Sequence, residues 1–174
     1  MKKIISLLIS AAMLLSCTGC DRIYALLHKA GGEERAILGA FEYNVYNPNV
    51  ERLQKILRAF GYTTGNPDGK FGVSTREAVA RFQKDEGLEV TRFVDKSTWA
   101  SMEEYLGSDL FKGVELNGKA VQLALRKAGV FSGKADGRLG PRTREAIQAF
   151  QSARGLAADG RIGLRTLKAL MKYL

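Results

Sequence analysis

The stretch Asp68–Leu88 reads DGKFGVSTREAVARFQKDEGL, and the stretch Asp136–Leu156, 68 residues later, reads DGRLGPRTREAIQAFQSARGL. The similarity at this spacing extends outward without a gap, from Val50 to Leu106 in the first copy and up to Leu174 in the second. Self-similarity at a fixed period indicates a duplicated structural unit. The chain therefore contains two copies of one small unit.

Each copy has the pattern of three helices separated by glycine-marked turns. The first helix of the first copy has apolar residues at helical spacing and ends before Gly61, because glycine readily takes the left-handed conformation after a helix. The second helix follows a D-G-x-x-G turn, and Pro141 suits its first position in the second copy. A third, shorter apolar pattern follows another turn. We therefore expect an all-α fold of two tandem three-helix units, residues 48–106 and 116–174.

The beginning of the chain has the pattern of an export signal. Lys2 and Lys3 precede an uncharged stretch, residues 4–16, which is too short to span a membrane and suits the apolar part of a signal peptide. We expect residues 1–16 to be a signal peptide. Its removal would lower the formal net charge from +9 to +7, an excess that suits an acidic polymer or an anionic surface.

Two cysteines follow this stretch, in Leu14-Leu15-Ser16-Cys17 and in Cys17-Thr18-Gly19-Cys20. Both runs resemble the lipobox of bacterial lipoproteins, a family in which the chain is cleaved before the cysteine and its thiol takes a diacylglycerol. Cys17 fits better, because Leu14 supplies the aliphatic residue three positions upstream, and Cys20 is the alternative. A C-x-x-C redox pair is a further interpretation, but no strand pattern surrounds it.

Residues 17–47 have no partner in the repeat, and we expect them to form the lipidated N-terminus and a tether. Two apolar clusters have helical spacing, so part of the tether is expected to form helix that packs on the first unit or lies at the lipid surface. These clusters are Ile23, Leu26 and Leu27, and Ile37, Leu38 and Phe41. A coil of about 30 residues would reach about 100 Å when extended.

Five short motifs recur in order in the repeats: the L-Q-x-x-L helix at Leu53–Leu57, the D-G-x-x-G turn, the T-x-x-A helix start, the F-Q pair and the G-L exit. Together they resemble the peptidoglycan-binding domain found at the ends of many cell-wall hydrolases and transpeptidases. The resemblance covers both repeats, about two thirds of the chain. It implies three-helix modules that bind bacterial cell wall and have no catalytic activity of their own.

The two copies depart from the family pattern in different places. The second copy has a second D-G-x-x-G-x-x-T turn at Asp159–Thr166, whereas the first has VTRFVD at Val90–Asp95 and lacks both glycines. We therefore expect a different backbone path there, and we expect the second copy to be the better binder. Conversely, the second copy has VQLAL at Val121–Leu125 in place of the fuller helix motif.

The candidate binding residues lie in and beside these turns, and each has a structural alternative. Aspartate before glycine can contact wall sugars or peptide amines, or it can hydrogen-bond its own turn. The glutamines can bind ligand or bridge loops. The basic residues can bind stem-peptide carboxylates or form a solvated surface, and the aromatic Phe71 can stack on sugars or pack in the core. The candidates are Asp68, Lys70, Phe71, Arg76, Gln83, Asp136, Arg138, Arg144, Gln151, Asp159 and Arg161.

We expect no catalytic activity, no metal and no cofactor. Glu77 and Glu145 lie in a first helical turn, where the helix dipole favours carboxylates, and neither copy places a second carboxylate at a matched position. Both cysteines precede the folded part, and His28 is the single histidine. A disulfide or thiolate site within the repeats and a histidine zinc cluster are therefore excluded. The predicted export signal argues against a nucleic-acid partner.

The sequence thus leads to one main hypothesis and one alternative. The main hypothesis is a non-catalytic lipoprotein of the bacterial cell envelope, facing the periplasm or cell wall. It would be anchored to a membrane through its N-terminal lipid and would tether or target to peptidoglycan. The alternative is an accessory or regulatory partner of a cell-wall hydrolase or transpeptidase, with the repeats binding protein as well as glycan.

Overall fold

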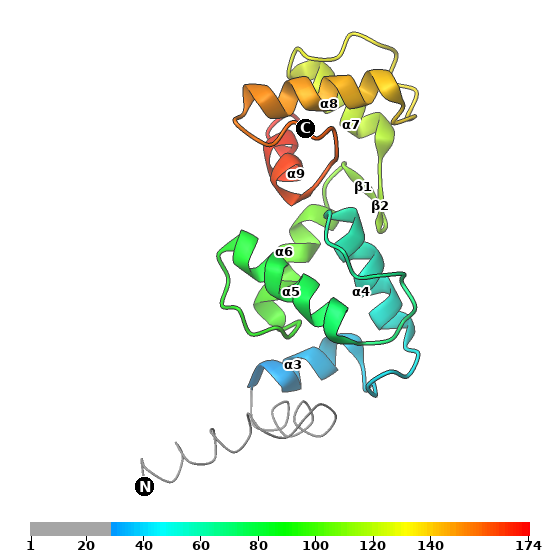
Figure 1. Cartoon of the computed structure of the whole chain (residues 1–174), viewed down its shortest axis with the longest axis vertical. Helices are drawn as coiled ribbons and strands as arrows, with labels where there is room; N and C mark the ends of the chain where they lie inside the picture. The colour runs from blue at the N-terminus through cyan, green and yellow to red at the C-terminus, as the bar shows by residue number, and fades with distance from the viewer. Residues whose placement is uncertain (1–28) are drawn as a thin grey trace, which may run out of the picture.

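The computed structural model describes residues 29–174, which form seven helices and one short hairpin (Figure 1). The predicted signal peptide and the candidate lipid sites Cys17 and Cys20 lie outside the described residues. Along the chain the elements are α3 (Lys29–Leu38), α4 (Pro48–Ala59), α5 (Val73–Glu86), α6 (Lys96–Leu106), β1 (Phe111–Lys112), β2 (Glu115–Leu116), α7 (Gly118–Lys127), α8 (Pro141–Ala153) and α9 (Leu164–Met171). Within residues 29–174, no helix has the length and apolar character needed to cross a membrane.

The predicted all-α class and the two tandem three-helix units are confirmed. Helices α4, α5 and α6 form the first unit and helices α7, α8 and α9 form the second, stacked along the long axis of the molecule (Figure 1). The second and third helices of the two units begin at equivalent positions, since α5 starts at Val73 and α8 at Pro141, and α6 starts at Lys96 and α9 at Leu164. The two-stranded hairpin between the units was not predicted. Gly113, with φ of 65°, allows its tight turn, and Phe111 pairs with Leu116.

The helix ends follow from local sequence. The side chain of Asn47 accepts hydrogen bonds from the amides of Asn49 and Val50, and Pro48 occupies the first position of α4. Helix α5 ends at Glu86, and the φ of 70° at the following Gly87 lets the amide of Leu88 donate to the carbonyl oxygen of Gln83 in the last turn. These caps set the directions in which the turns leave the helices.

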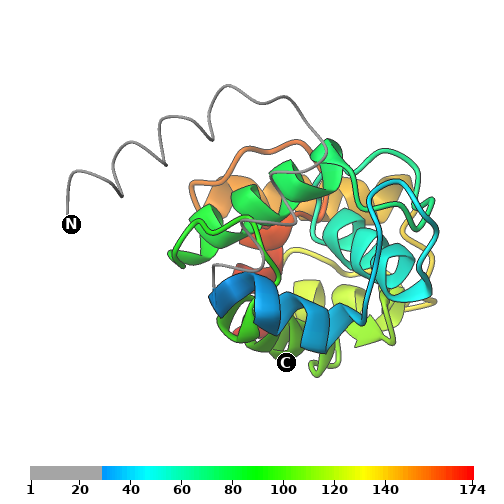
Figure 2. The same cartoon turned by 90° about the horizontal axis from the view of Figure 1, so that it is seen from below.

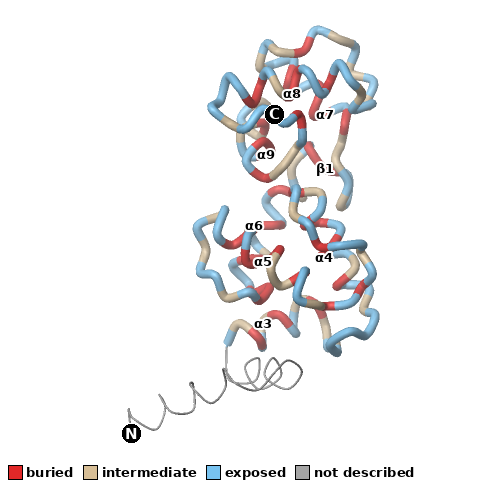
Figure 3. Tube along the Cα trace, viewed as in Figure 1, coloured by how far each residue is buried: buried red, intermediate tan, exposed pale blue. Residues whose placement is uncertain are grey.

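One apolar core runs through both units and across the contact between them. Figure 3 shows that each unit contains buried residues. The ring of Phe60 stacks on that of Phe82 at 5.6 Å and meets the edge of Phe111 at 5.7 Å. The amide of Leu164 in the second unit donates to the carbonyl oxygen of Phe60 in the first at 2.8 Å. The small units therefore share their burial, which adds to the little that each could bury alone.

Helix α3 belongs to the segment that we expected to form a tether, and it lies across the outer end of the first unit (Figure 2). It packs against α6, and Leu38 at its end is buried with 1% exposure. Of the two expected arrangements for this part of the segment, the structure shows packing on the first unit. The cluster of Ile23, Leu26 and Leu27 lies outside the described residues.

Candidate functional site

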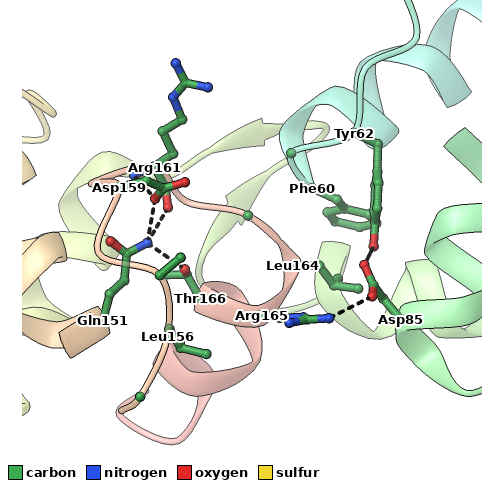
Figure 4. A pocket seen from close by; sticks show the side chains of 14 residues that line it. Phe60, Tyr62, Asp85, Gln151, Leu156, Asp159, Arg161, Leu164, Arg165 and Thr166 are labelled. Carbon is green, nitrogen blue, oxygen red and sulfur yellow. Dashed lines mark hydrogen bonds and ion pairs between the residues drawn. The ribbon is translucent and has the colours of Figure 1, made fainter. Parts of the chain in front are cut away.

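A buried glutamine holds the second turn of the second unit (Figure 4). The Nε2 atom of Gln151 lies 2.9 Å from a carboxylate oxygen of Asp159, 2.8 Å from the carbonyl oxygen of Arg161 and 3.1 Å from the hydroxyl of Thr166. Its Oε1 atom accepts from the amide of Gly160 at 2.9 Å. This arrangement, which we name the glutamine clasp, ties the end of α8 to the turn and to the start of α9.

The same clasp forms around the first turn of each unit. Gln54 contacts Asp68, the carbonyl oxygen of Lys70 and Thr75, and Gln122 makes the equivalent contacts 68 residues later. In both clasps the glycine amide of the D-G pair donates to the glutamine Oε1, at 2.9 Å for Gly69 and 2.7 Å for Gly137. The recurring D-G-x-x-G motif is thus the sequence pattern of a clasp.

The fourth clasp corrects one of our expectations. Gln83 lies 2.9 Å from the Thr91 hydroxyl, 2.8 Å from the carbonyl oxygen of Phe93 and 2.9 Å from the Thr98 hydroxyl, and it accepts from the amide of Arg92 at 2.9 Å. The prediction of a different backbone path at residues 90–95 was therefore wrong.

The first unit keeps the path because substitutes fill the two roles of the D-G pair. The hydroxyl of Thr91 replaces the aspartate as acceptor, and Arg92 takes a left-handed φ of 65°, close to the 69° of Gly160. Asp95 stands where the second glycine would be, and its carboxylate caps α6 by accepting from the amide of Thr98 at 2.8 Å.

The clasps use the polar groups of five candidate residues. Gln83 and Gln151 are almost fully buried, at 0% and 2% exposure. Asp68, Asp136 and Asp159 each accept from their glutamine and from the backbone amide two residues ahead. These side chains hold the turns in shape. Such contacts agree with the structural alternatives, in which the aspartates hydrogen-bond their own turn and the glutamines bridge loops.

The same contacts lower the pKa of the three aspartates below its ordinary range. For Asp68 and Asp159 the largest cause is the backbone amide two residues ahead, and the glutamine follows. For Asp136 the glutamine amide is the largest cause. Hydrogen bonds that favour the charged form have this effect, so the clasps hold ionised carboxylates.

Two further candidates are packed within the first unit. Arg76 forms an ion pair with Glu34 of α3 at 2.6 Å, and its guanidinium lies 4.0 Å from the ring centre of Phe71 and 4.5 Å from that of Phe93. Phe71 is 2% exposed and stacks on Phe41 at 4.8 Å. Its faces are thus covered by protein, which agrees with the core-packing alternative for Phe71.

The remaining candidates are exposed cations. Lys70 and Arg138 follow the first turn of each unit, Arg161 follows the second turn of the second unit, and Arg144 lies on the first turn of α8. Because the clasps fix the backbone of the turns, Lys70, Arg138 and Arg161 project from fixed turns, whereas Arg144 projects from helix α8. These cations are exposed to a ligand, as are the clasp aspartates Asp68, Asp136 and Asp159.

A cleft of about 280 Å³ lies between the units (Figure 4). One wall comes from residues 60–62 and Asp85 of the first unit, and the other comes from Gln151 and nine residues of the second unit, namely 155–157, 159, 161 and 163–166. The cleft brings together the candidates Gln151, Asp159 and Arg161.

A small polar network closes the first wall of this cleft. The hydroxyl of Tyr62 donates to Asp85 at 2.8 Å, and Arg165 of the second unit lies 3.3 Å from the same carboxylate. Burial and the bond to Asp85 raise the pKa of Tyr62. Asp85 and Arg165 were not among the predicted site residues, because neither occupies a fixed position of a family motif and their contact joins segments from different units.

The fold and its clasped turns define a tandem of small three-helix binding modules. A protein family described as "Putative peptidoglycan binding domain" matches residues 46–102 and 117–170, one match on each unit. These ranges cover more than half of the chain, and the chain belongs to this family. No solved structure matches the chain. Family membership indicates that the chain binds peptidoglycan and acts in the cell envelope.

Proposed function

We propose that this protein is a non-catalytic tether that binds peptidoglycan through both units and is held at a membrane by a lipid on Cys17. The observation that carries the proposal is the presence of two family modules that share one core and project exposed cations from clasped turns. Peptidoglycan stem peptides carry carboxylates, which suit such cations. The lipobox resemblance supports the anchor.

Two weak modules on one anchored chain act through effective concentration. Once one module is bound, the other meets its ligand in an intramolecular step, so that even about millimolar affinity for each site retains the protein at the wall. The non-catalytic role rests on the placement of the acidic residues. Glu77 forms an ion pair with Arg92 at 2.8 Å, so its carboxylate is engaged within the first unit.

The direct test is co-sedimentation of the full-length protein, solubilised in mild detergent, with purified peptidoglycan sacculi. We expect the protein to pellet with sacculi and to remain in solution without them. Failure to pellet under conditions in which a known wall binder does so would contradict wall binding. Loss of turbidity of the sacculus suspension would contradict the non-catalytic role.

The anchor and the alternative role need separate measurements. Labelled palmitate should be incorporated into the wild type and lost in Cys17→Ala, whereas loss in Cys20→Ala alone would assign the lipid to Cys20. Co-purification from membranes distinguishes a tether from a partner of a wall enzyme. A tether should be recovered without a stoichiometric hydrolase or transpeptidase.

A further inference from the structure

In the first unit, helix α3 places two carboxylates at the start of α6. Oε1 of Glu34 accepts from the guanidinium of Arg76 at 2.6 Å and from the amide of Val94 at 2.9 Å. Oε2 of the neighbouring Glu33 accepts from the amide of Lys96 at 3.1 Å. Glu34 is 1% exposed, so this is a built carboxylate site with a buried occupant.

The second unit repeats the donors of this site. At a shift of 68 residues, Arg76, Val94 and Lys96 correspond to Arg144, Ile162 and Leu164. The backbone is arranged alike, because the clasps of Gln83 and Gln151 make the same set of hydrogen bonds to their turns.

In the second copy of the site, the first unit supplies an acceptor for only one of the two positions that Glu33 and Glu34 of α3 fill in the first copy. The carbonyl oxygen of Phe60 accepts from the amide of Leu164 at 2.8 Å and thus takes the place of Glu33. Among residues 29–174, no group takes the place of Glu34, and neither the amide of Ile162 nor the guanidinium of Arg144 has a hydrogen-bond acceptor there.

The surroundings of the second site are also more open. Phe71 and Phe93, which enclose Arg76 in the first unit, are replaced by Leu139 and Arg161, both exposed. Arg144 lies over Gly160, where a Cβ atom would come within 2.6 Å of its Cγ atom. The side chain of Arg144 is exposed, and Arg161, also exposed, occupies the position that corresponds to Phe93, which lies against the Arg76 guanidinium in the first unit.

We propose that Arg144 and the Ile162 amide, with Arg161 beside them, bind a carboxylate of a peptidoglycan stem peptide, and that Glu34 fills the corresponding site of the first unit. This inference rests on the proposed wall binding and names the ligand group that the second unit recognises. Arg161 and Gly163, on either side of Ile162, line the cleft of about 280 Å³ between the units, a space suited to a short peptide. In peptidoglycan the stem peptides are the main carriers of carboxylates.

The test uses a disaccharide–tetrapeptide released from peptidoglycan by a muramidase, and the same compound with its carboxyl groups converted to carboxamides. In titrations of the full-length protein in detergent, followed by amide NMR, we expect the acid form to shift the Ile162 amide and the amidated form to leave it unchanged. Arg144→Gln should weaken the affinity about tenfold to a hundredfold, the loss expected for one charge-assisted hydrogen bond. The matched control is Arg142→Gln, an exposed arginine of α8 outside the site, which should bind as the wild type.

Equal binding of the two compounds, or wild-type affinity of Arg144→Gln, would overturn the inference. Wall binding is tested separately by co-sedimentation. If either of these outcomes is obtained while sacculi still retain the protein, only the proposed carboxylate site is contradicted. If the protein does not bind sacculi at all, the proposed function fails as well. A dimer that dissociates in Arg144→Gln would show a second copy of the chain as occupant and would also overturn the inference.

Discussion

Arg92 in the first unit and Gly160 in the second hold the same left-handed backbone conformation, with φ of 65° and 69°. Both amides donate to the Oε1 atom of a clasp glutamine, at 2.9 Å in each case. A residue with a side chain adopts this conformation at a cost of about 1 kcal/mol or more, which glycine avoids. The clasp of the first unit therefore contains a strained residue.

Replacing this arginine by glycine should relieve the strain. We expect Arg92→Gly to raise the free energy of unfolding by up to about 1 kcal/mol, because the relief exceeds the entropy cost of glycine and the small contribution of the exposed ion pair with Glu77. Urea unfolding measures the change. Arg92→Ala is the control, since it removes the ion pair and keeps the strain. A glycine variant less stable than the alanine variant would contradict the prediction.

The ion pair between Glu34 and Arg76 should contribute strongly to stability. Glu34→Gln leaves a largely buried guanidinium without its counter-charge, and we expect a loss of about 3 kcal/mol in the free energy of unfolding. Glu33→Gln, one residue away on the same helix, provides the comparison and should cost much less. Thermal unfolding of both variants would show the difference, and equal losses would argue against a special role for Glu34.

The contact between the units depends on the lack of a side chain at Gly61. A Cβ atom there would lie 2.9 Å from the Cα atom of Gly163, whereas the equivalent Gly129 has nothing within 4 Å. Both glycines have positive φ, 90° and 78°, so alanine strains the backbone at either position. We expect both alanine variants to lose about 1 kcal/mol, but only Gly61→Ala to displace the units, as measured by small-angle scattering. An unchanged scattering curve for Gly61→Ala would contradict this.

The clasp aspartates should make the fold sensitive to acid. The folded state lowers the pKa of Asp68, Asp136 and Asp159, so their stabilising effect is present above the ordinary aspartate pKa of about 3.9 and is lost as the pH falls through the lowered values. The urea concentration at the unfolding midpoint, measured from pH 6 down to pH 2, should therefore decrease once the pH is below about 4. Asp136→Asn should fall less steeply in the same range. Parallel curves would show that the clasp carboxylates are not the cause.

The helices, turns and caps could be predicted because they follow from residues close together in the chain. The D-G-x-x-G motif, the glycine after each helix and the period of the apolar residues are all local signals. The duplication doubled each of them. The same local reasoning failed at Arg92, where the absence of glycine suggested another path. The buried Gln83 imposed the path through hydrogen bonds that no local pattern reveals.

The contacts that shape the candidate site join segments far apart in sequence. Glu34 lies 42 residues before Arg76 and 60 before Val94, and Asp85 lies 80 residues before Arg165. Nothing in the short, charged stretch around Glu34 distinguishes a buried glutamate from a solvated one. Similarly, Gly61 suggests the end of a helix, and its second role in the contact with Gly163 depends on how two complete units meet.

Helix α3 also limits the length of the proposed tether. With a lipid on Cys17, the chain between Cys17 and Lys29 can span at most about 40 Å, less than half of the reach of the whole segment up to Asn47. Once the chain between Cys17 and Lys29 is extended, further tension between membrane and wall would act on the buried ion pair of Glu34 and Arg76. Rupture of that pair would lengthen the tether. It would also expose the carboxylate site of the first unit, so that the stretched molecule would have a second site for a stem-peptide carboxylate.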